Sequence, residues 1–305
     1  MNIPVRKAAA LGLLGAALVG CGGAGGSGAP TADAPKAPIA GASTGAPPPS
    51  ASAGTGTAAR PKPGAEPAAA PTMAPGPNGL TPVYTRRAAN SPKGAEKVVA
   101  LTFDADMTAD QGPRAARGER FDNPELIATL RRLEVDATVF MTGRWAEEYP
   151  DQAKAIGGDP RFEIANHSYS HHAFASPCYG LPSVAGPDMA ADVQRAFDAF
   201  RDAEALNVVP YFRFPGGCYD DAALRALGPA GVTAVQWDVV SGDAFAKDAD
   251  AVAEQVLDGV RPGSLVVMHC TRSAAPVTER AIRRIVPELR ARGYRFVKVS
   301  DLMRG

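Results

Sequence analysis

Short apolar runs of strand length recur along the C-terminal part of this chain, and segments with helical periodicity separate them. The runs are rich in β-branched and aromatic residues. They mostly lack alternation between polar and apolar positions, which is typical of strands that are buried on both faces. Seven such runs lie at residues 97–103, 137–142, 162–165, 209–214, 233–237, 264–268 and 294–299.

Apolar stripes between these runs have the spacing of helices that cover a sheet. One stripe follows Asn123 and Pro124, which form a helix cap and a proline at the first helical position. The stripes consist of Leu126, Ile127, Leu130 and Leu133 and, further along, of Ile282, Ile285, Val286 and Leu289. Strands that alternate with helices predict a parallel α/β fold, either open or closed as a barrel.

The N-terminus has the pattern of a secretory signal over residues 1–20, with a charged start and an apolar run too short to span a bilayer. Its end, Leu18-Val19-Gly20-Cys21, resembles the lipobox of bacterial lipoproteins. This resemblance implies a lipid on Cys21 and an exported protein that is held at the cell membrane only by this anchor, facing the cell envelope or exterior. An ordinary signal with a cysteine placed by chance is the alternative.

Residues 21–80 consist mainly of Ala, Gly, Pro, Ser and Thr, and we expect a disordered tether. Residues 81–305 are enough for one catalytic domain. Lys+Arg and Asp+Glu both number 32, and no basic stripe with interleaved aromatics occurs, which argues against nucleic acid as a partner. No second long apolar segment is present. We therefore expect a soluble, monomeric domain.

Three of the four histidines, His167, His171 and His172, lie in one stretch. Imidazole is a common metal ligand, and one helical turn would place His167 and His171 on the same side. A polar loop with surface histidines would also explain this cluster by itself. However, ionisable residues also end or follow several other predicted strands, and the C-terminal ends of such strands carry the chemistry in α/β barrels. These residues are Asp104, Asp106, Arg213, Asp238, Asp243 and His269.

Four motifs in this order resemble the polysaccharide deacetylases of the NodB-homology type, carbohydrate esterase family 4, from about residue 97 to the C-terminus. The motifs are Thr102-Phe103-Asp104, His167-Ser168-Tyr169-Ser170-His171, Arg213-Phe214-Pro215-Gly216-Gly217 and Val267-Met268-His269. The resemblance implies a distorted (β/α) barrel with about seven parallel strands. It also implies a metal-dependent hydrolase that removes acetyl groups from N- or O-acetylated polysaccharide.

The same resemblance implies roles for individual residues. Asp106, His167 and His171 would hold a divalent metal, with zinc first and other first-row metals as alternatives. Asp104 would be the general base, and Arg213 would orient it.

His269 would be the general acid that protonates the leaving group, and Asp243 would raise the pKa of His269 by stabilising the imidazolium. The N–H of Gly216 would hold the oxyanion.

The chain departs from the family at three places, of which Val267 in place of a common leucine is a minor change in an apolar wall. Ala105 stands where a second, adjacent aspartate is usual; in an extended strand Asp104 and Asp106 share a face while Ala105 points away. Ala244 stands where a groove-lining tryptophan is common, so Phe245 or Trp237 would line the cleft, with Trp237 favoured as part of the barrel wall.

The departure at Ala105 leaves a second function open, a carbohydrate-binding protein in which the reaction is lost. A metallopeptidase is disfavoured because the His-Glu-x-x-His pattern is missing. Peptidoglycan, chitin oligomers and xylan remain open as substrates.

Three cysteines follow Cys21. Since an exported protein meets oxidising conditions, we expect a Cys178–Cys218 disulfide with Cys270 free. Three buried reduced thiols are the alternative.

Overall fold

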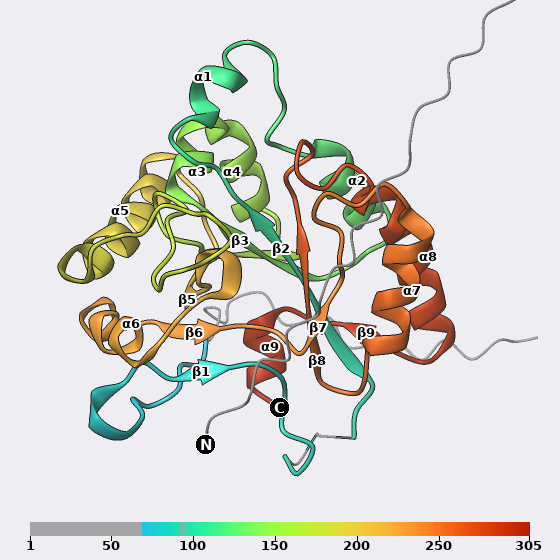
Figure 1. Cartoon of the computed structure of the whole chain (residues 1–305). Coiled ribbons are helices and arrows are strands. Elements are labelled where there is room, and N and C mark those ends of the chain that lie inside the picture. Colours follow the sequence, from blue (N-terminus) through green and yellow to red (C-terminus); the bar gives the residue numbers. More distant parts are fainter. Residues whose placement is uncertain (1–68, 92, 94) are drawn as a thin grey trace, which may run out of the picture. The chain divides into compact units, whose positions relative to one another are not determined.

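A parallel sheet forms the centre of the described part of the chain, which comprises residues 69–91, 93 and 95–305 of a computed structural model (Figure 1). Its hydrogen-bonded path is β1-β6-β5-β4-β3-β2-β8-β7, and β9 pairs with β2. All of these pairings are parallel. The strands are β1 Val83–Tyr84, β2 Val98–Ala105, β3 Ala137–Met141, β4 Phe162–Asn166, β5 Val208–Phe212, β6 Thr233–Val235, β7 Val239–Val240, β8 Ser264–His269 and β9 Arg295–Phe296. Because the two end strands of this path, β1 and β7, do not pair with each other within the described residues, the sheet is an open, curled half-barrel.

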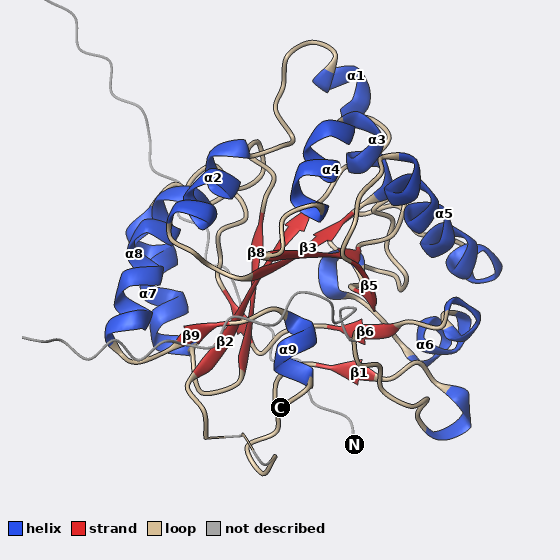
Figure 2. Cartoon of the chain, turned by 180° about the vertical axis from the view of Figure 1, so that it is seen from behind, coloured by secondary structure: helices blue, strands red, loops and turns tan. Residues whose placement is uncertain are grey.

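Helices surround the sheet, with α2, α7 and α8 grouped on one side and α3, α4 and α5 on the other (Figures 1 and 2). The helices are α1 Gln111–Ala115, α2 Pro124–Arg132, α3 Gly143–Glu148, α4 Pro150–Gly157, α5 Met189–Asp202, α6 Asp221–Ala226, α7 Ala249–Gly259, α8 Thr278–Ala291 and α9 Val299–Met303. None of the described helices is long and apolar enough to cross a bilayer. The predicted signal and Cys21 lie outside the described residues.

Strand β2 shows why the sheet needs cover on both faces, because all of its residues are buried. Val99, Leu101 and other odd-numbered residues belong to the core between the sheet and the outer helices. Val98 and Ala100 belong to the core inside the curl, together with Val299 of α9. This burial on two faces accounts for the lack of polar alternation in the sequence.

Both predicted helical stripes are helices. Asn123 caps α2, since its side chain accepts a hydrogen bond from the Leu126 N–H at 3.2 Å. The second stripe forms the buried face of α8.

Each of the seven predicted runs contains a strand, and the prediction of a distorted parallel barrel is confirmed as a half-barrel. Two strands of two residues each, β1 and β7, were not predicted. The last predicted run is mostly not a strand: β9 covers only two of its residues, and α9 begins at Val299.

The segment 69–80, which the sequence places in the tether, contacts the half-barrel. Tyr211 donates its hydroxyl hydrogen to the Pro71 carbonyl oxygen at 2.8 Å, and the Met73 N–H donates to Thr233 Oγ1 at 3.0 Å. Ala70 packs against the core inside the curl. The folded part of the chain therefore includes residues N-terminal to the predicted boundary at residue 81.

Candidate functional site

A cleft of about 610 Å³ opens at the C-terminal ends of the strands. Two loops that the sequence analysis did not assign supply part of its wall: the segment between β2 and α2, and the segment after the histidines. The cleft is lined by Asp104, Asp106, Thr108, Gln111, Arg114, Phe121, His167, His171, Tyr179, Leu181, Gly216, Trp237, Val240, Ala244, Phe245, Val267, His269, Ser273 and Ala274. The long interval between Asp106 and the cap of α2 was the sequence signal for the first of these loops.

The two histidines meet through a turn, so the prediction of a helical turn is wrong. Ser168 and His171 have φ values of 67° and 56°, which lie in the left-handed region. Asn166 Oδ1 accepts from the Ser168 N–H at 2.8 Å, and Ser168 Oγ accepts from the His171 N–H at 2.9 Å. These bonds replace helical hydrogen bonds and bring the rings of His167 and His171 to a centroid distance of 5.0 Å.

The two carboxylates face the histidines from the end of β2. Asp104 and Asp106 both line the cleft, whereas Ala105 is fully buried in the core behind the sheet. Strand alternation therefore places the pair as the sequence predicted. Asp104 Oδ2 lies 3.7 Å from His167 Nε2, and Asp106 Oδ2 lies 3.8 Å from His171 Nε2.

Both imidazoles are in a protonation state that suits binding of a cation. His167 Nδ1 is 2.9 Å from the Arg213 carbonyl oxygen, so Nδ1–H donates there and the lone pair of Nε2 faces the cleft. Burial lowers the pKa of His167, and it lowers the pKa of His171 to about 4 although Asp106 acts in the opposite direction. Burial would raise the pKa of Asp106, but the nearby His171, His269 and His167 and a hydrogen bond from Thr271 together outweigh burial, so this pKa is lowered.

The carboxylate oxygens and imidazole nitrogens of these residues are of the chemical type that binds a divalent metal. Two atoms that bind one ion at about 2.1 Å each lie at most about 4.2 Å apart, so each aspartate–histidine pair is within reach of an ion. The donors form two pairs, however, and no three described His, Cys, Asp or Glu side chains are placed around one point so that they could hold an ion.

Asp104 has a second, closer partner. Arg213 is fully buried, and its Nη1 donates to Asp104 Oδ1 at 2.6 Å. Its Nε donates to the Val235 carbonyl oxygen at 3.2 Å, and its guanidinium lies 3.8 Å from the ring centre of Phe140. Arg213 therefore fixes one carboxylate oxygen of Asp104 and leaves the other facing His167.

His269 ends β8 on the other side of the cleft and is bound to Asp243. His269 Nδ1 lies 2.8 Å from Asp243 Oδ1, and the Asp243 carboxylate also accepts hydrogen bonds from Ser241 and Thr278. Burial would lower the pKa of His269, but the hydrogen bond and the charge of Asp243 raise it to about 10. The imidazolium is therefore the stable form at neutral pH. Asp238, in contrast, binds Ser264 and Leu265 at the start of β8, and the prediction that it lies at this edge is wrong.

Aromatic side chains line the rim. Trp237 lines the cleft, so its assignment to the barrel wall alone is corrected, and Phe245 lines it as well with 80% of its surface exposed. Tyr179, which the sequence analysis missed, is 90% exposed at the same cleft. Pyranose rings pack on exposed aromatic faces of this kind.

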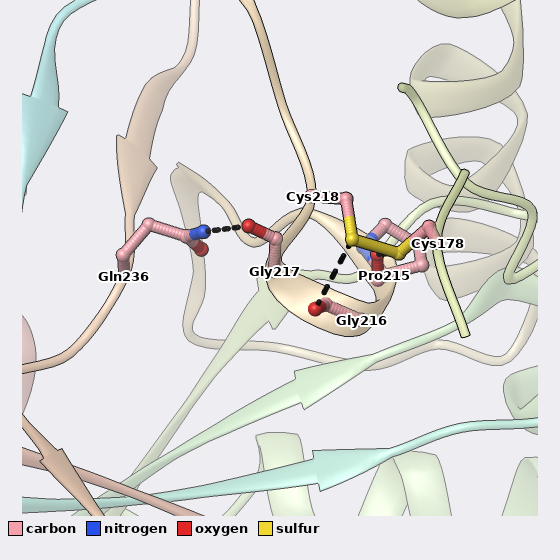
Figure 3. The surroundings of a disulfide bond; sticks show 6 residues. All are labelled: Cys178, Pro215, Gly216, Gly217, Cys218 and Gln236. Carbon is pink, nitrogen blue, oxygen red and sulfur yellow. Dashed lines mark hydrogen bonds between the residues drawn. A yellow bond between two sulfur atoms is a disulfide. The ribbon is translucent and has the colours of Figure 1, made fainter. Parts of the chain in front are cut away.

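Gly216 lines the cleft beside a disulfide (Figure 3). Cys178 and Cys218 form this bond with a Cα–Cα distance of 6.0 Å, which confirms the predicted pairing. Cys270 is free and fully buried, and burial raises the pKa of its thiol to about 12. His172 is half-buried next to His171, and it does not line the cleft.

The chain is similar to known deacetylases. Residues 91–235 match the family described as polysaccharide deacetylase. A chitooligosaccharide deacetylase of Sinorhizobium fredii is 29% identical over 221 residues, which are 69% of this chain and 94% of the relative. A peptidoglycan-N-acetylglucosamine deacetylase of Bacillus cereus is 29% identical over 212 residues, which are 68% of this chain and 89% of the relative.

The fold is also that of solved structures. A CE4-family pseudoenzyme from Bacillus anthracis has a TM-score of 0.57 at 23% identity, covering 73% of this chain and 69% of its own. A mutant of that pseudoenzyme has restored enzymatic activity.

Proposed function

We propose that this chain is a metal-dependent hydrolase that removes acetyl groups from an N- or O-acetylated polysaccharide, because residues 91–235 match the polysaccharide deacetylase family. The observation that carries the proposal is that a proton acceptor and a proton donor face the same cleft. Asp104 accepts a hydrogen bond from Arg213, and the ring of His269 is hydrogen-bonded to Asp243. Since the relatives act on chitooligosaccharide and on peptidoglycan N-acetylglucosamine, a glycan of N-acetylated sugars is the first substrate class.

Asp104 acts as the general base. Its oxygen that is not bound to Arg213 accepts the proton of the attacking water. Asp106, His167 and His171 would hold the ion, and this set of carboxylate and imidazole ligands suits zinc and other first-row metals. When bound, such an ion supplies a water of lowered pKa and a positive charge beside the acetyl carbonyl.

The acyl carbon becomes tetrahedral when water attacks, and its oxygen becomes negative. The Gly216 N–H, at the wall of the cleft, donates to this oxygen, and one such donor contributes roughly 2.7–4 kcal/mol. His269 then gives its proton to the leaving amine or alcohol. Trp237, Phe245 and Tyr179 pack against sugar rings along the rim.

Acetate release tests the proposal. Purified protein is incubated with N-acetylglucosamine oligomers, peptidoglycan fragments and acetylated xylan, with zinc and with a chelator. We expect acetate from at least one glycan, loss of the activity with the chelator and recovery when metal is added back. If none of the three glycans releases acetate although the protein binds metal in stoichiometric amount, the proposal that the protein is a deacetylase is contradicted.

A carbohydrate-binding protein on the same fold is the second candidate. Ala105 favours it, as does the arrangement of the metal donors in two pairs, and a pseudoenzyme with this fold exists. Titration of the same glycans by calorimetry separates the two functions, because this candidate binds a glycan without releasing acetate.

A further inference from the structure

The turn that carries Gly216 is packed tightly on two sides. Gly216 and Gly217 have φ values of 64° and 72°, which favour glycine. A Cβ on Gly216 would lie 2.6 Å from Cys178 Sγ, and a Cβ on Gly217 would lie 2.6 Å from Trp237. Two adjacent glycines also make the turn easy to rotate, so its conformation depends on what holds it.

One holding contact comes from a residue outside the four motifs. Gln236, which follows β6, donates from Nε2 to the Gly217 carbonyl oxygen at 3.1 Å (Figure 3). Its side chain is 6% exposed, and its Oε1 accepts no hydrogen bond from any described residue. The backbone N–H of Gln236 donates to the Tyr84 carbonyl oxygen at 2.8 Å, which fixes the residue on the sheet. The single side-chain hydrogen bond of this buried amide therefore goes to the turn.

The disulfide holds the same end of the turn from the other side. Cys218 directly follows Gly217 and is joined to Cys178. Phe214 and Tyr219, which flank the turn, stack with a centroid distance of 4.9 Å. The Gly217–Cys218 peptide, which follows Gly216, is thus held at two points. The Gln236 amide binds its carbonyl oxygen, and the disulfide fixes the side chain of Cys218.

We propose that Gln236 is a positioning residue for the deacetylation. By fixing the Gly217 carbonyl, it prevents rotation of the two glycines and keeps the Gly216 N–H directed at the oxyanion. The inference rests on the proposed function and adds a residue to it. Since complete loss of one oxyanion donor costs about 10²–10³ in kcat, loss of its alignment is expected to cost about 10-fold.

The test is Gln236→Met in the full chain, which keeps the length of the side chain and removes the amide. With an N-acetylglucosamine oligomer as substrate, kcat should fall about 10-fold while KM and the bound metal stay unchanged. The Ki of an oligomer with a methylphosphonamidate in place of one acetamide should rise by the same factor, because this group mimics the tetrahedral oxyanion. Gln194→Met, which removes an amide bonded to Asp198 on the surface of α5, is the matched control and should change neither value.

A second variant keeps the inference testable if Gln236→Met does not fold. Gln236→Glu has the same size but cannot donate when ionised, and it should lower kcat at least as much as Gln236→Met. A lower melting temperature with kcat and Ki unchanged would make Gln236 merely structural and overturn the inference. Wild-type protein that releases no acetate would instead overturn the proposed function, and this inference with it.

Discussion

Asp104 and Asp106 are only two residues apart, but their partners differ. Asp104 is bound to the buried Arg213, whereas Asp106 accepts a hydrogen bond from Thr271 and lies near His171. A carboxylate held by a guanidinium is poorly placed to give both oxygens to an ion. The contacts therefore support Asp104 as base and Asp106 as ligand.

Replacement of each aspartate by asparagine should separate these roles. Asp104→Asn should keep its metal and lose activity by roughly 10²–10⁴, the usual contribution of a positioned base. Asp106→Asn should bind metal weakly and regain part of its activity when metal is added. Elemental analysis and acetate release at increasing zinc concentration measure both. The reverse pattern would exchange the two roles.

The contact between His269 and Asp243 predicts how the activity depends on pH. The carboxylate raises the pKa of His269 to about 10, so the protonated acid is present at neutral pH and is lost as the pH rises through the folded value. A bound cation would lower this pKa, in wild type and variant alike. Asp243→Asn removes the charge, and the alkaline limb of kcat/KM should move to lower pH by about 1–3 units.

Ser241→Ala is the control for this shift. It removes one hydrogen bond to Asp243 Oδ1 but leaves the carboxylate charge in place. Its alkaline limb should stay near that of the wild type in the pH–rate profile. An unchanged limb in Asp243→Asn would mean that Asp243 does not set the pKa of the acid.

The placement of a side chain could be predicted from the sequence where a single physical rule determines it. Strand alternation was enough to place Asp104 and Asp106 on one face. The route by which His167 meets His171 could not be predicted, because it depends on side chain to backbone hydrogen bonds of Asn166 and Ser168 that compete with a helix. Asp238 was misplaced for a related reason: two-residue β7 starts immediately after it, so it lies at the opposite end of a strand too short to show in the sequence.

At the scale of elements, long buried strands and stripes were recognisable and short ones were not. β1 and β7 have two residues each and are held by their neighbours rather than by a pattern of their own. The segment 69–80 was read as tether from its composition, yet it is bonded to Tyr211 and Thr233. Tertiary contacts decide the conformation of such segments, and composition does not record them.

This segment gives a prediction about stability. A protein that starts at residue 81 lacks both hydrogen bonds and the cover of Ala70, whereas one that starts at residue 63 keeps them. Two hydrogen bonds of about 0.5–1.5 kcal/mol each correspond to a melting temperature lower by about 2–12 °C for a domain of this size. Thr233 begins β6, at the end opposite the cleft, so kcat per folded molecule should be unchanged. Equal melting temperatures in calorimetry would show that the segment adds no stability.

At the scale of the whole molecule, the sequence predicted a catalytic domain preceded by a signal and a tether, and the described residues cover the domain and the last part, residues 69–80, of the predicted tether. The parallel half-barrel and the matching family support the first part. The N-terminal part rests on the pattern around Cys21 alone. The two parts should therefore be separable in function.

Cys21 is the residue on which the location of the whole protein depends. We predict that the full chain, expressed in a bacterium that processes lipoproteins, fractionates with membranes, because two acyl chains at about 0.8 kcal/mol per buried methylene anchor a protein stably. Cys21→Ser should move it to the soluble exported fraction with the same acetate release per molecule, since the cleft is formed by residues from Asp104 onward. Cys270→Ser is a matched control, because this thiol is buried in the domain and its loss should not affect fractionation. A Cys21→Ser protein that remains with the membrane would exclude the lipid anchor, and one that leaves the membrane but loses activity per molecule would show that the anchor also serves the reaction.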